Sequence, residues 1–343
     1  MKDATITDVA ERADVSKSTV SAVINDRDVV KDTTRKRVLD AIQELNYRPR
    51  RSSGRASGKN IGFVIKEAEN PYYAETLVGI QEAAAKEGYL TFASSSERDF
   101  ETEKQIIDQF SSQNLDGIII APILNNKTDL SHIFELKRYN IPFVLLEKLR
   151  GIQAHLVDID NVEASSEAAG HLIELGHERI VHFAGPTYSK HTQERIDGVQ
   201  RAFSQSQFAI GGDAVVHSGD AFDDGYEQGL DYFQDWNGTP TAATCYNDLV
   251  ALGLMKALEE LDLKVPEDVS VVGFDNLNML DYSSIPLTTV NVPKHEMGRR
   301  ATELLLRQIE SGETGTHKQV TLDADLALRS STAPPHSKRE ASA

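Results

Sequence analysis

The sequence predicts a small all-α head followed by a larger α/β body in two lobes, each built on a parallel sheet wrapped by helices. Residues 5–47 carry apolar side chains at helical spacing in three short stretches. From residue 60 onward, short β-branched runs alternate with amphipathic helical stretches, which is typical of parallel sheets. About eight to ten strand–helix units are too many for one open sheet. We therefore expect two lobes in the body.

Three short helices are expected in the head. Thr5 and Asp8 have the spacing of a capping box, Ser16 can cap a second helix, and Asp32 opens a third. Asp14 stands in the turn between the first two helices, where an Asx residue can adopt the left-handed conformation. The apolar positions make a minimal core for three helices: Ile6, Val9, Ala10, Ala13, Val20, Val23, Ile24, Val38, Leu39, Ile42 and Leu45.

The body repeats one rhythm twice. Its predicted strands are 60–65, 89–94, 117–121 and 142–147 in the first half, and 179–184, 214–217, 241–246 and 269–274 in the second. Helical stretches such as 71–87 and 102–113 separate them. Residues 49–59, rich in Arg, Ser and Gly, are expected to link the head (1–48) to the body (60–332), and the polar tail 333–343 is expected to be disordered.

Charge is divided unevenly along the chain. The net charge of −17 taken alone argues against a nucleic-acid partner, because an acidic surface repels polyanions. Residues 1–59, however, hold 13 Lys and Arg against 9 Asp and Glu, a local net charge of +4, which leaves −21 for the rest. A basic head on an acidic body indicates contact with DNA at one end of the molecule.

Composition also indicates the cellular compartment of the protein. The sequence has no apolar run of the roughly 18 residues that a membrane span needs, and its start lacks the apolar core of a signal peptide. The single cysteine, Cys245, excludes an internal disulfide and fits a reducing compartment, where it is expected to fill a small buried apolar position. A cytoplasmic protein is therefore expected.

Longer motifs then carry a resemblance that covers about residues 4–331. In the head these are ITDVA (6–10), ADVSKSTVSAVIN (13–25), TTR (33–35) and LNYRP (45–49); in the body they are NPYY (70–73), DGI (116–118), LGH (175–177), ND (247–248) and VSVVGFD (269–275). Together they closely resemble the lactose-repressor/galactose-repressor family of transcription regulators.

The resemblance implies a helix-turn-helix head and a body like the periplasmic sugar-binding proteins. We place the three crossings between the lobes near Asp160, Val290 and Val320, so that lobe 1 spans about 60–159 and 291–320, and lobe 2 about 160–290 and 321–332. It further implies a homodimer that binds a palindromic operator in double-stranded DNA, acts as a repressor and responds to a sugar-like effector.

The head residues that would contact DNA follow from the same resemblance. A recognition helix needs short polar side chains that reach base edges in the major groove. The positions matching Lys17, Ser18 and Ala22 select the base sequence in the family. The expected DNA-binding set also includes Thr5 and the residues that mostly hold phosphates: Ser16, Thr19, Ser21, Asn25, Thr34 and Tyr47. A merely solvated helix face is the alternative.

The linker departs from the family pattern. Ala56 stands where relatives insert a leucine into the minor groove, and an alanine methyl is too small to unstack a base step well. Gly54 costs about 1 kcal/mol in any helix formed there. We hypothesise that Arg50, Arg51 and Arg55 compensate by minor-groove and phosphate contacts and that the operator is kinked less than in relatives. A flexible tether is the alternative.

An effector site is expected where strands of both lobes end, because open α/β sheets bind ligands there. By resemblance it would contain Asn70, Tyr72, Tyr73, Glu147, Lys148, Arg195, Asn247 and Asp275. Of these, Arg195, Asn247 and Asp275 match the residues that hold sugar hydroxyls in the family. The alternatives are structural: a tyrosine in the lobe core, Asp275 as a helix cap, and Arg195 in a surface ion pair.

The pair Glu147-Lys148 replaces the Asp-Arg that sugar binders often carry, so the ligand can differ from theirs. A purine corepressor is disfavoured, because Ser189 and Ala221 stand where an arginine and an aromatic residue are expected for base recognition.

Other classes of function fit poorly. The sequence has no Walker or Gly-x-Gly-x-x-Gly motif after its first strand, His171, His177 and His182 lack metal-ligand spacing, and alternate faces of a strand would separate Asp158 from Asp160. We therefore expect no enzyme activity, no cofactor and no metal. Two alternatives remain open: a global catabolite-type regulator controlled by a phosphoprotein, and a sugar-binding transport protein.

Overall fold

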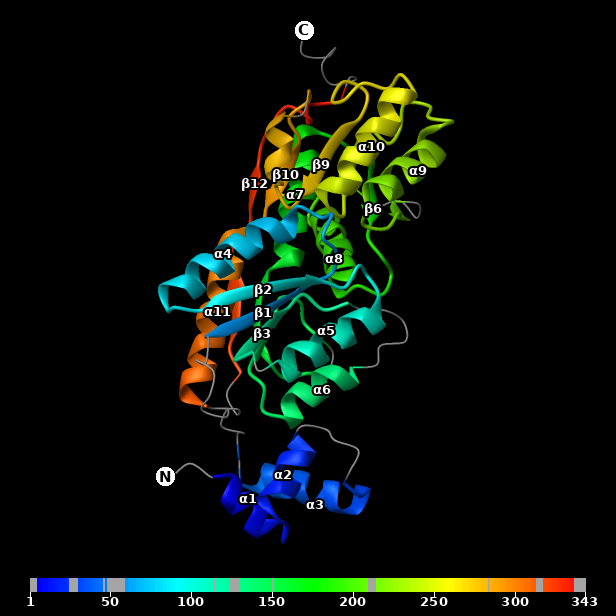
Figure 1. The fold of residues 1–343 in the computed structure, drawn as a ribbon. Helices are drawn as coiled ribbons and strands as arrows, with labels where there is room; N and C mark the ends of the chain where they lie inside the picture. Colours follow the sequence, from blue (N-terminus) through cyan, green and yellow to red (C-terminus); the bar gives the residue numbers. More distant parts are fainter. Residues whose placement is uncertain are drawn as a thin grey trace.

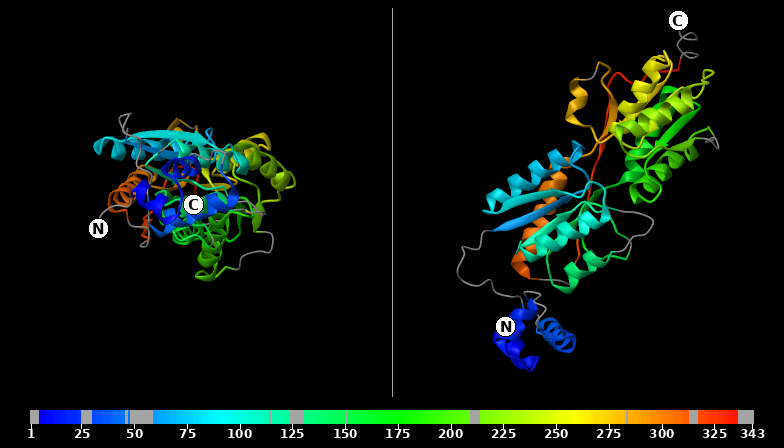
Figure 2. Two further views of the ribbon diagram at one scale, coloured as in Figure 1. Left: turned by 60° about the horizontal axis from the view of Figure 1, so that its bottom comes forward. Right: turned by 45° about the vertical axis from the view of Figure 1, so that its right-hand side comes forward.

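The computed structural model describes residues 5–24, 30–45, 47, 59–113, 115–123, 130–149, 151–208, 214–282, 284–312 and 317–335. A three-helix head and two α/β lobes follow one another in space (Figure 1), with the head at one end in the second view of Figure 2. The predicted fold class is confirmed. In the described part of the chain, no helix is both long enough and apolar enough to span a membrane.

The head consists of α1 (Ile6–Arg12), α2 (Lys17–Ile24) and α3 (Asp32–Glu44). The predicted capping box is present: the Thr5 hydroxyl accepts from the Asp8 amide at 3.3 Å, and the Thr5 amide donates to the Asp8 carboxylate at 2.6 Å. Asp14 has a φ of 53°, as the turn required. Val9, Val20 and other small apolar side chains fill the core between the helices.

Lobe 1 contains a six-stranded parallel sheet in the order β11-β5-β4-β3-β1-β2. The strands are β1 (Asn60–Ile65), β2 (Leu90–Ser95), β3 (Gly117–Ile120), β4 (Phe143–Leu145), β5 (His155–Ile159) and β11 (Gln319–Leu322). Helices α4 (Tyr72–Lys86) and α11 (Lys294–Ser311) cover one face, and α5 (Phe100–Ser112) and α6 (Ser131–Arg138) cover the other (Figure 1).

Alternation along β3 shows why both faces are covered. Ile119 packs into the cluster that contains residues of α4 and α11, whereas Ile118 and Ile120 pack into the cluster with α5 and α6. Successive side chains of a strand point to opposite faces, so an uninterrupted apolar strand needs a helical layer on each side. The three consecutive isoleucines at 118–120 therefore fit a central strand that is covered by helices on both faces.

Lobe 2 contains a second sheet in the order β12-β10-β9-β8-β6-β7. Its strands are β6 (Ile180–Ala184), β7 (Val215–His217), β8 (Ala242–Cys245), β9 (Ser270–Phe274), β10 (Thr288–Asn291) and β12 (Asp325–Ala327). All pairings are parallel except that of β12 with β10. The helices pack as two pairs, α7 (Asn161–Leu175) with α8 (Lys190–Ser204) and α9 (Phe222–Phe233) with α10 (Asp248–Glu260), and a short 3₁₀ helix, η1, spans Asn278–Tyr282.

The chain passes between the two sheets three times. The first passage is at Asp160, between β5 and α7, and the second is at residues 292–293, between β10 and α11. The third falls at residues 323–324, between β11 and β12. We expected it near Val320, but that residue lies within β11 and pairs with Val157, so this expectation was wrong by a few residues.

The predicted tail also begins later than expected. The amide of Ala333 donates to the Ser270 hydroxyl at 3.0 Å, and its carbonyl accepts from Ser270 and is hydrogen-bonded to His177. Residues 333–335 therefore belong to lobe 2, because these bonds fix the chain against β9. Residues 336–343 lie outside the described part of the chain.

Helices α4 and α11 approach each other closely through two glycines. A Cβ on Gly79 would lie 2.0 Å from the His295 carbonyl oxygen, and one on Gly298 would lie 2.1 Å from the Thr76 carbonyl oxygen. No side chain fits at either position. The start of α11, which leads from the second passage, is thereby packed directly against α4.

Candidate functional site

One candidate surface is the polar side of α2 in the head. Ser16, Lys17 and Ser18 are exposed, whereas Val20 and Val23 on the opposite side are buried in the head core. The Ser16 hydroxyl lies 2.7 Å from that of Ser18 and 2.8 Å from that of Thr19, and it also accepts from the Thr19 amide. Short hydroxyl side chains therefore form a connected, protruding row at the start of this helix.

The other predicted DNA-contacting residues fall in different environments. Thr5, Thr19, Ser21, Ala22 and Thr34 are half-buried at the head surface. Tyr47, which we expected to hold a phosphate, packs its ring in the head core. Asn25, Arg50, Arg51, Arg55 and Ala56 lie outside the described residues.

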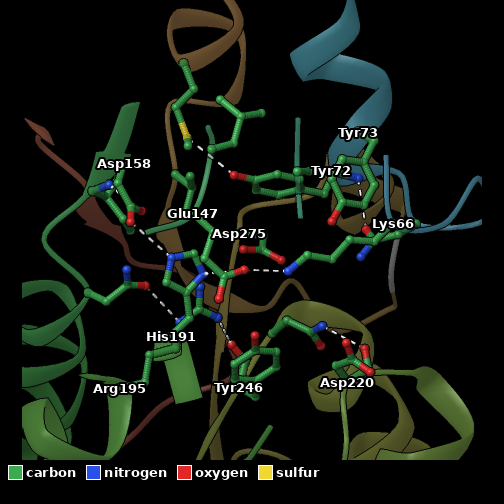
Figure 3. Close-up of a pocket in the computed structure, with 18 of the residues that line it drawn as sticks. Lys66, Tyr72, Tyr73, Glu147, Asp158, His191, Arg195, Asp220, Tyr246 and Asp275 are labelled. Carbon is green, nitrogen blue, oxygen red and sulfur yellow. Dashed lines mark hydrogen bonds and ion pairs between the residues drawn. The ribbon is translucent and has the colours of Figure 1, made fainter. Parts of the chain in front are cut away.

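The second candidate site is a polar cavity between the lobes, shown in Figure 3. Its volume is about 80 Å³. Residues that follow strands of both sheets line it, among them Lys66 after β1, Glu147 after β4, Asn247 after β8 and Asp275 after β9. Carboxyl ends of parallel strands meet at one edge of each sheet, and the two edges face each other here.

Arg195 forms the base of this cavity from α8. Its guanidinium lies 3.6 Å from the centroid of the Phe274 ring and 4.6 Å from that of Tyr246. Its Nε donates to the Asn161 side-chain oxygen at 3.1 Å, and Nη1 donates to the Tyr246 carbonyl. Arg195 is buried, not in a surface ion pair, and these contacts fix the plane of its guanidinium.

Asp275 presents a buried carboxylate to the same cavity. Within the described residues, this carboxylate accepts no hydrogen bond and forms no ion pair. Burial raises the pKa of Asp275, and the positive charges of Arg195 and Lys294 oppose that effect without cancelling it. Asp275 lines the cavity, where a hydrogen-bond donor from outside the protein can reach its carboxylate.

The backbone at Asp275 is held in an unusual conformation. Asp275 has a φ of 114° and Asn276 a φ of 54°, values that L-residues seldom adopt. Lys294, at the start of α11, donates from Nζ to the Asp275 carbonyl at 2.5 Å and to the Asn276 carbonyl at 2.9 Å. Its Nζ also lies 3.6 Å from the Glu75 carboxylate in α4. A lobe 1 helix thus fixes the lobe 2 turn that carries Asp275.

Asn247 uses both ends of its amide. The side-chain oxygen accepts from the Val250 amide at 2.8 Å and caps α10, and the Nδ2 group donates to the Asp220 carbonyl at 2.7 Å. The neighbouring Asp248 is fully buried and accepts from the Leu277 amide and the Thr289 hydroxyl. Burial and the nearby Asp275 raise the pKa of Asp248 to about 8.

A partly buried ion pair joins Lys66 to Glu147 at 2.5 Å on the lobe 1 side. Burial raises the pKa of Glu147, but Lys66 and His191 outweigh it and lower that pKa to about 2. Burial lowers the pKa of Lys66, but the interaction with Glu147 opposes this effect, and the net result is a raised pKa. Both groups therefore stay charged in the cavity.

Contacts between the lobes surround the cavity. Nε2 of His191 in α8 donates to the Asp158 carboxylate of β5 at 3.1 Å, and its Nδ1 lies 3.9 Å from the Glu147 carboxylate. At the rim, Arg98 forms ion pairs with Asp220 of lobe 2 and Glu67 of lobe 1. Burial lowers the pKa of Arg98, but the two ion pairs have the larger combined effect, so the pKa is raised. The two lobes are thus joined by ionisable groups.

Seven of the eight predicted effector residues line the cavity. Lys148 does not, because it is exposed and its side chain points away from the buried Glu147 beside it. Sequence reasoning missed several lining residues: Lys66, Glu67, Asp158, Asn161, His191, Asp220, Tyr246 and Met297. Lys66 directly follows the first strand, which was a usable signal. His191 lies on a helix and carried none.

Comparison with known proteins decides the family. Residues 5–50 match the model for bacterial regulatory proteins of the lacI family, and residues 169–332 match a periplasmic binding protein-like domain. The "HTH-type transcriptional repressor PurR" of Aliivibrio salmonicida (strain LFI1238) is 34% identical over 90% of this chain and 92% of its own length. The chain belongs to the lacI family of bacterial regulatory proteins.

Solved structures of this lacI-family fold agree with the arrangement above. The complex of the transcriptional regulator CelR with cellobiose has a TM-score of 0.72 and 29% identity, and covers 96% of this chain and 99% of its own. The lac repressor dimer bound to operator and the anti-inducer ONPF has a TM-score of 0.70 and 28% identity, and covers 97% and 100%. The chain is therefore a DNA-binding transcription regulator with a helix-turn-helix head.

Proposed function

We propose that this regulator is a cytoplasmic homodimeric repressor whose affinity for a palindromic operator is set by a sugar-like effector bound between the lobes. One observation supports an effector of this class. The cavity contains both a fixed guanidinium, that of Arg195, and a buried carboxylate, that of Asp275, which has no hydrogen-bond donor among the described residues. A polyol hydroxyl donates and accepts at once, so it satisfies both groups.

The aromatic lining supports the same class of ligand. Tyr72 and Tyr73 contact each other edge to face with ring centroids 5.3 Å apart, and Tyr246 stands across the cavity. Such rings supply an apolar surface for a sugar ring, with hydroxyl groups at their edges. The similar regulator CelR binds cellobiose, and a LacI family regulator from Enterococcus faecium has ribose bound, which favours a sugar here.

For the chain as a whole we propose a head of residues 1–48, a linker of 49–59, lobe 1 from about 60–159 with 294–322, and lobe 2 from about 161–291 with 325–332. Residues 333–335 extend lobe 2. The exposed row at Ser16, Lys17 and Ser18 would enter the major groove, with Lys17 directed at guanine and Ser16 at a phosphate. No catalytic step is proposed for any residue.

Control of DNA binding would follow from the contacts between the lobes. A ligand that donates to Asp275 and accepts from Arg195 would bind near two contacts between the lobes, that of His191 with Asp158 and that of Arg98 with Asp220. It would weaken or strengthen these contacts. It would therefore change the relative position of the lobes, and across a homodimer it would change the spacing of two heads. The effect on operator affinity equals the difference in effector affinity between the two arrangements.

A panel of sugars in a thermal-shift assay tests the effector class. One sugar is expected to raise the melting temperature of the full chain, and Asp275→Asn is expected to abolish that rise, because its amide no longer accepts with both atoms. Lys148→Gln serves as the matched control, since its side chain lies outside the cavity. No stabilisation by any sugar at millimolar concentration would contradict the proposal and favour control by a phosphoprotein.

A further inference from the structure

A second cavity opens at the opposite edge of the lobe 1 sheet from the cleft between the lobes. Its volume is about 210 Å³, larger than that of the cleft. It lies at the amino ends of β4, β5 and β11, beside the last turns of α6 and α11. In Figure 1 both helices reach the end of the body that is nearer to the head. The lining residues are Lys137, Asn140, Ile141, Pro142, Phe143, Ala154, Gln308 and His317.

Two side chains of this lining each have a buried polar atom that finds no hydrogen-bond partner among the described residues. These atoms are Nδ1 of His317 and Oε1 of Gln308. Buried polar atoms in native proteins nearly always have a partner, and one without a partner costs about 1–3 kcal/mol. Since both side chains line one cavity, a rotation of each toward a bound molecule would satisfy both atoms.

The charge in this cavity has one sign. Burial lowers the pKa of Lys137. Burial and the charge of Lys137 lower the pKa of His317, and burial and His317 lower that of His155, whose ring centroid lies 5.9 Å from that of His317. Among the residues that the structure describes, no carboxylate lies within ion-pair distance of these three basic groups. Both imidazoles are therefore uncharged near pH 7, and among the described lining residues Lys137 supplies the positive charge that an anion would meet.

The other lining residues set the size and kind of molecule. Phe143 and Ala154 are buried and Ile141 is half-buried, so one wall of the cavity is apolar. Gln308 presents an acceptor, which a hydroxyl group of a bound molecule would satisfy. The cavity thus combines a basic end, an acceptor and an apolar wall.

We propose that this cavity is a second ligand site, which takes a small phosphorylated polyol. Lys137 and His317 hold the phosphate by charge-assisted hydrogen bonds, Gln308 accepts from a hydroxyl, and the carbon chain lies against Ile141 and Phe143. The site is separate from the cleft, since the two share no lining residue.

Helix α11 connects the two sites. Met297 lines the cleft and Lys294 holds the Asp275 turn, whereas Gln308 lines the second cavity, 14 residues after Lys294 in the same continuous helix. At a rise of about 1.5 Å per residue this separation is about 21 Å. A molecule that fixes the end of α11 therefore acts on the helix that holds the Asp275 turn.

Isothermal titration calorimetry with the full chain tests the proposal, with glycerol 3-phosphate as the probe and inorganic phosphate and glycerol for comparison. Glycerol 3-phosphate is expected to bind the wild type more tightly than phosphate does, and glycerol is expected not to bind. Lys137→Gln and His317→Gln should each weaken binding by about tenfold or more, the value of one charge-assisted hydrogen bond. Arg138→Gln, an exposed neighbour on the same helix, should bind as the wild type does.

Imidazole NMR resonances give a second readout that does not depend on the stability of a variant. Glycerol 3-phosphate should shift the resonance that is missing in the His317→Gln spectrum. Absence of binding to the wild type would overturn the proposal. So would binding that survives both substitutions but is lost in Asp275→Asn, because the probe would then occupy the cleft. Failure of the sugar panel leaves this test unaffected, since it concerns other residues.

Discussion

Replacing Lys294 by methionine should loosen the turn that carries Asp275 while leaving the head intact. The Lys294 side chain is almost fully buried, and its ammonium donates to the carbonyls of Asp275 and Asn276 at 2.5 and 2.9 Å. Methionine has a similar volume but no donor. Both carbonyls would lose a charged partner, and the two positive φ angles would lose the group that holds them.

The magnitude follows from these contacts. A hydrogen bond from a charged group contributes about 1.5–3 kcal/mol, so loss of two should lower the free energy of unfolding of the body by about 3–6 kcal/mol. With a urea dependence of about 3 kcal/mol per molar, the midpoint of unfolding should fall by about 1–2 M. Affinity for a cleft ligand should fall by about tenfold or more, because Asp275 is no longer held in place.

Urea unfolding followed by circular dichroism measures the first effect, and calorimetry with the stabilising sugar measures the second. Lys264→Met is the matched control, because the Lys264 side chain is exposed and forms no ion pair with a described residue. An unfolding midpoint for Lys294→Met equal to that of Lys264→Met would refute the reasoning. So would an unchanged affinity for the cleft ligand.

Three further predictions concern other parts of the molecule. The pKa of Glu147 is lowered to about 2, so its contribution to stability is present above its unfolded pKa near 4.5 and is lost as the pH falls through about 2. Glu147→Gln should therefore remove about 3 kcal/mol of the acid dependence of stability, measured by urea unfolding at a series of pH values. Gly298→Ala should destabilise by about 1–3 kcal/mol, because its Cβ would lie 2.1 Å from the Thr76 carbonyl oxygen, whereas Gly170→Ala, with no atom within 4 Å, should stabilise α7 by about 0.5–1 kcal/mol; equal melting temperatures would contradict this. Lys17→Ala should weaken operator binding in fluorescence anisotropy by about 1–3 kcal/mol and reduce discrimination against random duplex, and an unchanged ratio of the two affinities would count against base contact by α2.

The sequence predicted the head in detail because its signals are local. The capping box at Thr5 and the left-handed turn at Asp14 depend on residues within a few positions of each other. In the body, alternation of strands and helices predicted two sheets, and eight strands were located. The strands β5, β10, β11 and β12 were not among them, because they lie at the passages between lobes, where the chain changes sheet without a turn signal.

The cleft was predictable only where its residues follow strands. Glu147 and Lys148 are neighbours, and because successive side chains of an extended segment point to opposite sides, the burial of Glu147 puts Lys148 outside. His191 and Lys294 reach the site from helices, and their placement depends on how the lobes pack. The second cavity gave no signal, since its lining comes from α6, α11 and the segments before three strands.

The most direct measurement of the central claim is operator selection by the full chain from sheared genomic DNA, followed by anisotropy titration of the selected fragment against random duplex, with and without the sugar that stabilises the protein. The account predicts a strong preference for one palindromic sequence, sensitive to salt, and a change in that preference when the sugar is added to the wild type but not to Asp275→Asn. Equal binding of all fragments, or an equal sugar response from Asp275→Asn, would contradict it.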